Sequence, residues 1–313
     1  MRASVPDESS QLYANCQLCP RACALDRTMR VGVCGASDAL KIGRAALHWW
    51  EEPCLVGDRG SGAIFFAHCA LGCVYCQNKE LAQGSGVEVS QLRLQEIMLE
   101  LQDDQHAANI NLVTASHYAP TVASVLKELR EESHALRIPV VWNTAGYESM
   151  QTLELLEGLV DIYLVDLKYA KRDTAARLSH AVDYPEVALR AIHAMIEQVG
   201  TPVFDEEGYL KKGVIIRHLV LPGYVDESFQ VLENIQHEFG DAALVSIMNQ
   251  FTIVDDSFDP HEYGLERVVS DKDYERVLDY ADSLGMDDYF WQEGGAATAS
   301  FVPSFDGTGV LSS

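Results

Sequence analysis

The sequence predicts an α/β protein built from parallel βα units. Short apolar segments of strand length alternate along most of the chain with amphipathic segments of helical length. Hydrophobic residues make up 48% of the 313 residues, enough to bury a sizeable core and to exclude a disordered or fibrous protein. The length allows two domains or one α/β barrel. We find no internal repeat and no low-complexity linker.

The alternation gives six strand and helix segments in order. The expected strands are 63–67, 110–114, 140–143, 162–167, 214–221 and 243–248, and the helices are 92–101, 121–132, 149–159, 185–199, 227–239 and 271–284. Pro139 ends a helical pattern just before the third strand, because proline disfavours helix at the residue that precedes it. The segment before residue 54 lacks the alternation. We therefore expect a cysteine-rich appendage over 1–53 and a barrel over 54–313.

Charge and hydropathy limit the partners and the location of the protein. The net charge of −24 argues against binding to nucleic acid or to anionic lipid, where Lys and Arg must neutralise phosphate. The first residues lack an apolar signal segment. The apolar runs are far shorter than the about 20 residues of a membrane-spanning helix. We expect a cytoplasmic protein, in which clustered thiols bind metal more often than they form disulfides.

Four of the eight cysteines lie close together near the start of the chain, at Cys16, Cys19, Cys23 and Cys34. Four thiolates complete the coordination of one zinc ion or one iron–sulfur cluster. The spacing predicts a closed metal site and does not choose between zinc and a cluster. The alternative is four reduced cysteines without a metal.

A second cluster has three members, Cys69, Cys73 and Cys76. It follows the strand expected at 63–67 and so lies on a loop at a strand end. Three thiolates leave one iron of a [4Fe–4S] cluster without a protein ligand, and that iron is open to a substrate. Gly72 allows the positive φ that such a loop needs. Cys54 stands apart, and we expect an ordinary thiol there.

The stretch Cys69-Ala-Leu-Gly-Cys73-Val-Tyr-Cys76-Gln-Asn resembles the signature of radical S-adenosylmethionine (SAM) enzymes, including the aromatic Tyr75. Within that superfamily nearly the whole chain resembles the uncharacterised proteins related to pyruvate formate-lyase-activating enzyme. The further matching stretches are Cys16-Gln-Leu-Cys19-Pro-Arg, Gly60-Ser-Gly-Ala-Ile-Phe-Phe and Gln292-Glu-Gly-Gly.

The resemblance implies an open, partial (β/α)6 radical SAM barrel with a [4Fe–4S] cluster whose fourth iron binds SAM. It implies reductive cleavage of SAM to a 5′-deoxyadenosyl radical, with an electron from a donor such as flavodoxin or ferredoxin. The radical would take hydrogen from a substrate, either a glycine of a partner protein, as in glycyl-radical activases, or a small molecule. The other alternative is an iron–sulfur electron-transfer protein without SAM chemistry, which a fourth ligand from Cys54 or His68 would favour.

The ends of the second and third strands carry polar residues where parallel barrels place their chemistry. Members of the family hold the amino group of SAM at the second strand end through a Gly-Gly-Glu stretch. Here Thr114-Ala-Ser116-His stands in its place, so we expect backbone carbonyls near Thr114 or the Ser116 hydroxyl to serve. At the third strand end the family's Asp-Thr-Asn-Gly corresponds to Asn143-Thr144-Ala-Gly. Asn for Asp removes a negative charge from the family's cation site.

The fourth and sixth strand ends complete the expected site. Asp166 and Lys168 match the family's Asp-x-Lys pattern and, two residues apart on a strand, point to the same face. They line the SAM site or form a structural ion pair at the barrel mouth. Met248 and Gln250 also share a face and are expected to line an adenine pocket, although Met often fills a core. At the fifth strand end the candidates are His218 and Pro222-Gly-Tyr224.

Overall fold

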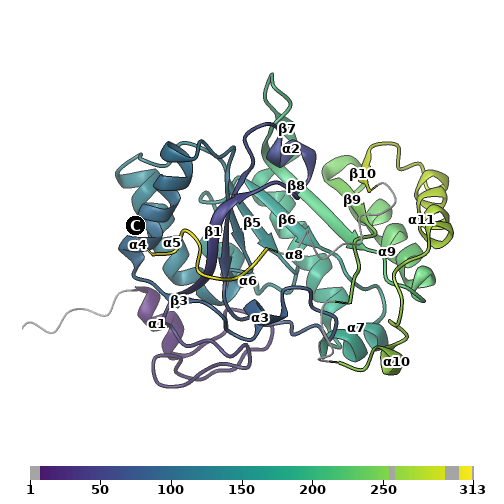
Figure 1. Cartoon of the computed structure of the whole chain (residues 1–313), viewed down its shortest axis with the longest axis horizontal. Helices are drawn as coiled ribbons and strands as arrows, with labels where there is room; N and C mark the ends of the chain where they lie inside the picture. Colours follow the sequence, from purple (N-terminus) through teal and green to yellow (C-terminus); the bar gives the residue numbers. More distant parts are fainter. Residues whose placement is uncertain (1–7, 254–257, 293–302, 312–313) are drawn as a thin grey trace, which may run out of the picture.

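The computed structural model describes residues 8–253, 258–292 and 303–311 (Figure 1). Its centre is a sheet of ten strands in the order β10-β9-β8-β6-β5-β4-β2-β1-β3, with the short β7 paired to β8. The strands are β1 (Lys41–His48), β2 (Ser61–Phe66), β3 (Val87–Glu88), β4 (Ile110–Val113), β5 (Val140–Thr144), β6 (Ile162–Asp166), β7 (Val203–Phe204), β8 (Leu210–Leu219), β9 (Leu244–Met248) and β10 (Tyr289–Trp291). The two end strands, β10 and β3, do not pair with each other, so over the described residues the sheet is open.

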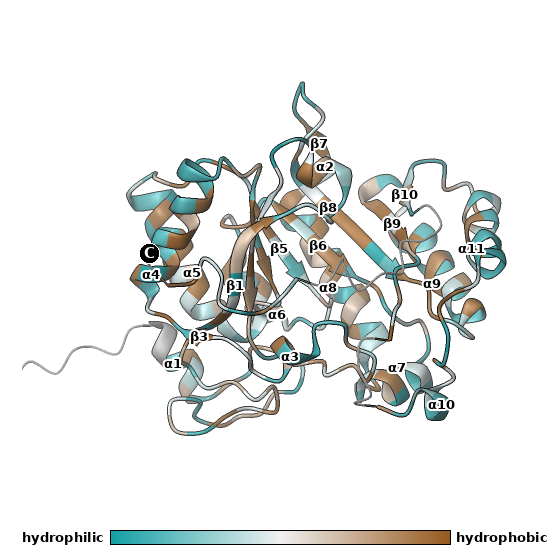
Figure 2. Cartoon of the chain, viewed as in Figure 1, coloured by the Kyte–Doolittle hydropathy of each residue, from teal (hydrophilic) through white to brown (hydrophobic). Residues whose placement is uncertain are grey.

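The strands β2, β4, β5, β6, β8 and β9 are parallel neighbours and coincide with the six predicted strands. The predicted α/β fold with a mostly parallel sheet is therefore confirmed. Every residue of β2, β4 and β5 is buried, as expected where parallel strands are covered on both faces. Figure 2 shows these central strands as mostly apolar, whereas the outer helices carry polar residues.

Helices follow most of the parallel strands and cover the sheet. They are α1 (Glu8–Ala14), α2 (Pro53–Val56), α3 (Lys79–Ala82), α4 (Gln91–Leu99), α5 (Ala119–Lys127), α6 (Met150–Leu156), α7 (Arg172–Ser179), α8 (Tyr184–Val199), α9 (Val225–Glu238), α10 (Pro260–Tyr263) and α11 (Asp271–Ser283). The side chains of Ser90, Ser149 and Ser270 accept a backbone N–H three residues later and cap α4, α6 and α11. In the part of the chain that the structure describes, no helix is long and apolar enough to cross a bilayer.

The segment before residue 54 contributes a strand that the sequence pattern does not predict. Strand β1 pairs antiparallel with β2 and so extends the barrel sheet beyond its first parallel strand. Helix α2 packs Cys54 and Leu55 against Ile162 at the start of β6 and Ile215 in the middle of β8. In Figure 1 it lies beside β7, at the end of the barrel where β8 begins. The division of the chain at residue 53 stays a prediction.

A buried arginine anchors the cysteine-rich segment. Arg27 is 0% exposed and donates hydrogen bonds to the carbonyl oxygens of Ala36 (3.1 Å), Ser37 and His117 (2.5 Å). The His117 bond crosses to the loop after β4. Its guanidinium also lies over the rings of Tyr13 and Tyr118, where a cation is attracted to the aromatic face. The charge is thus surrounded by acceptors, which a buried charge requires.

We expect Leu55→Ala to lower the free energy of unfolding by about 2–5 kcal/mol, because it opens a cavity beneath the strands. Leu55 is 0% exposed. Urea unfolding measures the loss. Leu92→Ala is the matched control, since Leu92 is 63% exposed and its change should stay within about 0.5 kcal/mol. Equal losses in the two variants would contradict the packing of α2 against the barrel.

Candidate active site

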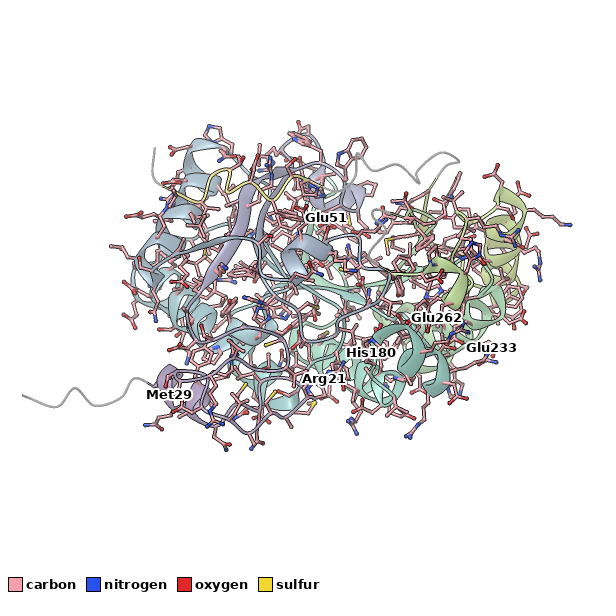
Figure 3. The ribbon with its side chains drawn as sticks, turned by 60° about the horizontal axis from the view of Figure 1, so that its bottom comes forward. Arg21, Met29, Glu51, His180, Glu233 and Glu262 are labelled. Carbon is pink, nitrogen blue, oxygen red and sulfur yellow. The ribbon has the colours of Figure 1, made fainter. Side chains whose placement is uncertain are left out.

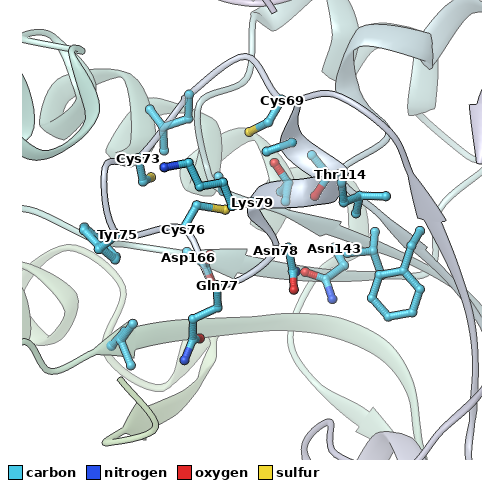
Figure 4. A pocket seen from close by; sticks show the side chains of 18 of the residues that line it. Cys69, Cys73, Tyr75, Cys76, Gln77, Asn78, Lys79, Thr114, Asn143 and Asp166 are labelled. Carbon is cyan, nitrogen blue, oxygen red and sulfur yellow. The ribbon is translucent and has the colours of Figure 1, made fainter. Parts of the chain in front are cut away.

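A cavity of about 400 Å³ opens at the carboxyl ends of the parallel strands (Figure 4). This size lies within the about 300–1,000 Å³ of small-molecule sites. The predicted residues in its lining are Cys69, Cys73, Tyr75, Cys76, Thr114, Asn143, Thr144, Asp166, Lys168 and Met248. The structure therefore brings these predicted residues together. Ser116 lines a small neighbouring cavity instead.

The cysteine loop, residues 67–78, connects β2 to α3 and carries the three thiols. His68 and Gly72 have φ of 76° and 68°, and these two positive values turn the chain between the strand and the helix. A side chain at Gly72 would meet nothing within 4 Å, so glycine serves the backbone conformation there and not a close approach. The positive φ predicted for Gly72 is confirmed. All three cysteines are free thiols.

Burial favours the neutral form of two of the loop thiols, Cys73 and Cys76. Burial raises the pKa of Cys76 to about 12. Burial also raises the pKa of Cys73, although the nearby Lys168 cation and a hydrogen bond from Ser179 act in the opposite direction. Binding of iron requires thiolates, so it would release these protons. A bound metal centre would replace these thiol protons with its own positive charge.

The three thiols suit a cluster better than a single ion. Among the described residues, no three His, Cys, Asp or Glu side chains are arranged to hold one metal ion. A [4Fe–4S] cluster offers each thiolate its own iron, so its ligands need not surround a common point. Cys69, Cys73 and Cys76 all line the same cavity, which leaves room beside them for a ligand. Cys54, considered as a fourth ligand, packs on α2 among apolar residues outside this lining.

Arg217 connects the polar groups at the inner end of the cavity. Its guanidinium bonds to Asp166 Oδ1 (2.9 Å), Glu51 Oε2 (3.1 Å) and Asn143 Oδ1 (2.9 Å). Asn143 Nδ2 donates in turn to Glu51 Oε1 at 3.1 Å. Lys168 Nζ lies 2.6 Å from the other oxygen of Asp166. The predicted pairing of Asp166 with Lys168 is present, within a larger network that includes two residues that sequence reasoning missed.

The charges in this network differ between the carboxyl groups. Burial favours a neutral Asp166, but the Arg217 and Lys168 cations outweigh it and lower the pKa of Asp166. At Glu51 burial outweighs the same Arg217 and raises the pKa. Burial raises the pKa of the adjacent Glu52 to about 7. Asp166 is therefore the carboxylate that Arg217 and Lys168 keep ionised.

Ser116 and Thr144 share a buried partner, Glu148, which sequence reasoning missed. Glu148 Oε1 accepts from Ser116 Oγ (2.5 Å), Thr144 Oγ1 (2.6 Å) and Trp142 Nε1 (3.1 Å). Burial raises the pKa of Glu148 despite these donors. The Ser116 proton is thus directed at Glu148, and Glu148 connects the segment after β4 to the end of β5. Thr114 has φ of 61°, which turns the chain immediately after β4.

On the far side of the cavity Met248 lies at the end of β9 and lines the wall together with Gln250. Gln77 of the cysteine loop donates to the Gln250 carbonyl at 2.8 Å, so this wall and the loop are connected. On β8 the sequence analysis selects His218, but its ring bonds to the Leu167 carbonyl and to Ser228 of α9. The neighbouring Arg217 faces the cavity instead. The signal in the sequence that could have found Arg217 is a single arginine within the apolar run of a core strand.

The N-terminal thiols lie within one looped segment. Cys16 and Cys19 are buried, and Cys23 and Cys34 are half-buried. Burial raises the pKa of Cys19 to about 12, and the other three thiols add to the shift. The backbone N–H of Val33 donates to Cys23 Sγ at 3.4 Å. The four thiols are therefore neighbours, and the metal predicted for them stays a prediction.

A profile described as the radical SAM superfamily matches residues 63–234, more than half of the chain. The uncharacterised protein MJ0674 of Methanocaldococcus jannaschii is 28% identical over 288 residues, covering 89% of this chain and 78% of the relative. The structure of Streptococcus suis SuiB bound to the precursor peptide SuiA superposes with a TM-score of 0.49 and 13% identity, over 74% of this chain. SuiB bound to SAM gives 0.46 and 12%, over 76% of this chain. In both cases the match covers 48% of SuiB, so the chain spans about half of its length.

We expect Arg217→Gln to lower the free energy of unfolding by about 3–5 kcal/mol at pH 8, because it leaves buried carboxylates without their cation. The low pKa of Asp166 means that its stabilising contribution is present above the unfolded value of about 3.9 and is lost as the pH falls through the native value. Without Arg217 these carboxyls take up protons more readily. The deficit relative to the unmodified chain should therefore shrink between pH 8 and pH 5.

Urea unfolding at the two pH values measures this deficit. Arg276→Gln is the control, because Arg276 forms an exposed ion pair with Asp273 on α11 and should change stability by less than about 1 kcal/mol. A deficit for Arg217→Gln that is the same at pH 5 and pH 8 would show that packing, and not charge, is lost.

Proposed function

Because the chain belongs to the radical SAM superfamily, we propose that it is an iron–sulfur enzyme that cleaves SAM reductively. One observation carries the proposal: three free thiols on a single strand-end loop line a cavity of about 400 Å³ together with the polar ends of the neighbouring strands. Barrel enzymes place their chemistry at this end of the strands. Cys69, Cys73 and Cys76 would hold a [4Fe–4S] cluster and leave one iron open.

The chemistry that this cluster and SAM supply when bound is the transfer of one electron to SAM, whose cleavage gives methionine and a 5′-deoxyadenosyl radical that abstracts hydrogen. The protein supplies binding, orientation and the exclusion of water. We propose that a one-electron donor of the flavodoxin or ferredoxin type supplies the electron.

The polar wall of the cavity has groups suited to the methionyl end of SAM. Lys168 keeps its proton, because the Asp166 carboxylate outweighs burial and raises the pKa of the lysine. It is therefore a cation beside the cysteine loop, and we assign it to the carboxylate of SAM. Thr114 and Thr144, at the ends of β4 and β5, provide acceptor oxygens for the amino group. Ser116 donates to Glu148, which also accepts from Thr144, and it would in this way help to fix Thr144 in position.

The rest of the wall is suited to the nucleoside end. Phe65, Val113 and Leu219 line the cavity with apolar surface, which excludes water from the space beside the cysteine loop. Met248, at the end of β9, also lines the cavity and would contact the adenine ring. Asn143 is fixed between Glu51 and Arg217 and would present its amide near the ribose. Apart from Ser116, which lines a small neighbouring cavity, the predicted binding residues line this one cavity.

We further infer from the sequence resemblance that the enzyme is of the glycyl-radical activase type, acting on a glycine of a partner protein. The supporting stretches are the cysteine loop with its preceding strand and the segment that begins at Gln292, although 293–295 lie outside the described residues. A reaction in which the radical ends on a protein backbone supports this substrate class. A modified small molecule as the product contradicts it.

We expect Cys73→Ala to lose SAM cleavage, because two thiolates cannot hold the cluster in its open-iron form. After anaerobic reconstitution and reduction with dithionite, chromatography of 5′-deoxyadenosine measures the cleavage. Cys54→Ala is the matched control, since it removes a buried thiol that packs on α2, and it should still form the product. Cleavage that persists in Cys73→Ala would overturn the assignment.

We also propose that Cys16, Cys19, Cys23 and Cys34 close around one zinc ion or a second cluster when the metal binds, since no three such side chains of the described residues are already arranged around one ion. Their support is their spacing and their position as neighbouring free thiols in one loop. Anaerobic metal analysis of the whole chain distinguishes the cases: about four irons with one zinc indicate a zinc site, and about eight irons indicate two clusters. About four irons without zinc would contradict metal binding at these thiols. The same analysis of Cys19→Ala should lose that second metal and keep the first cluster.

A further inference from the structure

A chain of three hydroxyl groups leads to the sulfur of Cys73. Ser179 Oγ donates to Cys73 Sγ at 3.0 Å. Tyr169 OH lies 2.7 Å from Ser179 Oγ, and Tyr75 OH lies 2.7 Å from Tyr169 OH. The chain thus begins and ends in the cysteine loop, and it passes through α7 and the segment after β6. The proposed binding of SAM makes no use of these hydroxyls.

The direction of the chain follows from its proton count. Each hydroxyl has one proton to donate. Since Ser179 gives its proton to Cys73, Tyr169 must donate to Ser179, and Tyr75 must donate to Tyr169. Both tyrosines keep their protons at neutral pH, as an ordinary phenol does. Three donors therefore point in one direction, toward the sulfur.

The chain of hydroxyl groups is shielded from water along its length. Tyr75 is 6% exposed, Tyr169 1% and Ser179 0%. Away from water each bond polarises the next, so the donor strength of Ser179 is greater than that of an isolated serine. Water therefore has little access to the positions of these hydroxyls and does not readily replace one that is removed.

The end of α7 is attached to the cysteine loop, which fixes Ser179 in place. The Val74 N–H donates to the Leu178 carbonyl at 2.9 Å. Arg21, from the N-terminal cysteine segment, donates to the carbonyls of Ser179 (3.1 Å) and Leu71 (3.0 Å). Figure 3 shows Arg21 beside His180, the residue that follows α7. The serine and the sulfur are therefore held by the same set of bonds.

We propose that Ser179, polarised by Tyr169 and Tyr75, is a positioning residue that raises the reduction potential of the cluster bound at Cys73. The inference rests on the cluster proposed above. One-electron reduction, by dithionite in the experiment below, adds negative charge to the cluster and its thiolates. A hydrogen bond to a ligand sulfur stabilises the reduced form more than the oxidised form. No proton moves in this step.

The midpoint potential of the reconstituted full-length protein tests the proposal. It is measured by titration with dithionite in the absence of SAM, with the electron paramagnetic resonance signal of the reduced cluster as the readout. Ser179→Ala should shift the reduction equilibrium toward the oxidised form by about tenfold, or about 59 mV for one electron. Tyr169→Phe leaves the serine in place and should give a smaller shift of the same sign, and Tyr75→Phe a smaller one still.

Two matched controls remove similar buried hydroxyls elsewhere. Ser228→Ala removes the hydroxyl that bonds to His218, and Tyr163→Phe removes the one that bonds to Gln198. Both should keep the potential of the unmodified protein. Shifts in the controls as large as those in the chain would overturn the proposal.

The outcomes distinguish a failure of the proposed function from a failure of the role proposed for the hydroxyl chain. An unmodified protein that binds no [4Fe–4S] cluster contradicts the proposed function itself. A cluster that assembles normally but has the same potential in Ser179→Ala and Tyr169→Phe overturns only the role of the hydroxyl chain. If Ser179→Ala fails to fold or to retain its cluster, Tyr169→Phe decides: a lowered potential supports the proposal, and an unchanged one overturns it.

Discussion

The buried guanidinium of Arg217 holds three parts of the molecule in register. It bonds at once to the end of β6 through Asp166, to β5 through Asn143 and to the segment before α2 through Glu51. Parallel strands are joined by helices on their outside, so their inner polar groups must find partners across the barrel. A planar group with several donors in fixed directions suits this task better than an ammonium group. The polar inner end of the cavity depends on this one side chain.

The network also sets the charge of the site. Arg217 and Lys168 together outweigh the burial of Asp166 and keep it ionised, whereas Glu51, deeper in the barrel, has a raised pKa. The two cations remain charged because a carboxylate is in contact with each. The cavity thus has both fixed charges and apolar surface in its lining.

The sequence could predict the parts that depend on local pattern. Period-two and helical periodicity gave the six parallel strands, and short cysteine spacings gave the loop at the first strand end. Asp166 and Lys168 lie two residues apart at the end of the predicted strand, so alternation predicted their common face, although β6 itself ends at Asp166. Glu51, Glu148 and Ser179 could not be found in this way, because each meets its partner only after segments distant in the sequence pack together. Strand β1 was missed for a related reason, since it pairs only at the edge of the sheet.

The position of Tyr75 shows how a motif residue acquires more than one role. Its ring lines the cavity and contacts Phe251, with 6.2 Å between the ring centres, while its hydroxyl turns toward Tyr169. A phenylalanine would keep the packing and lose the first donor of the chain that ends at Cys73. Because Tyr75 lies between Cys73 and Cys76 in the loop, a shift of the loop would move the sulfur and this donor together. The hydrogen bond from Val74 to α7 and those from Arg21 are therefore what keep the distance from Ser179 to the sulfur constant.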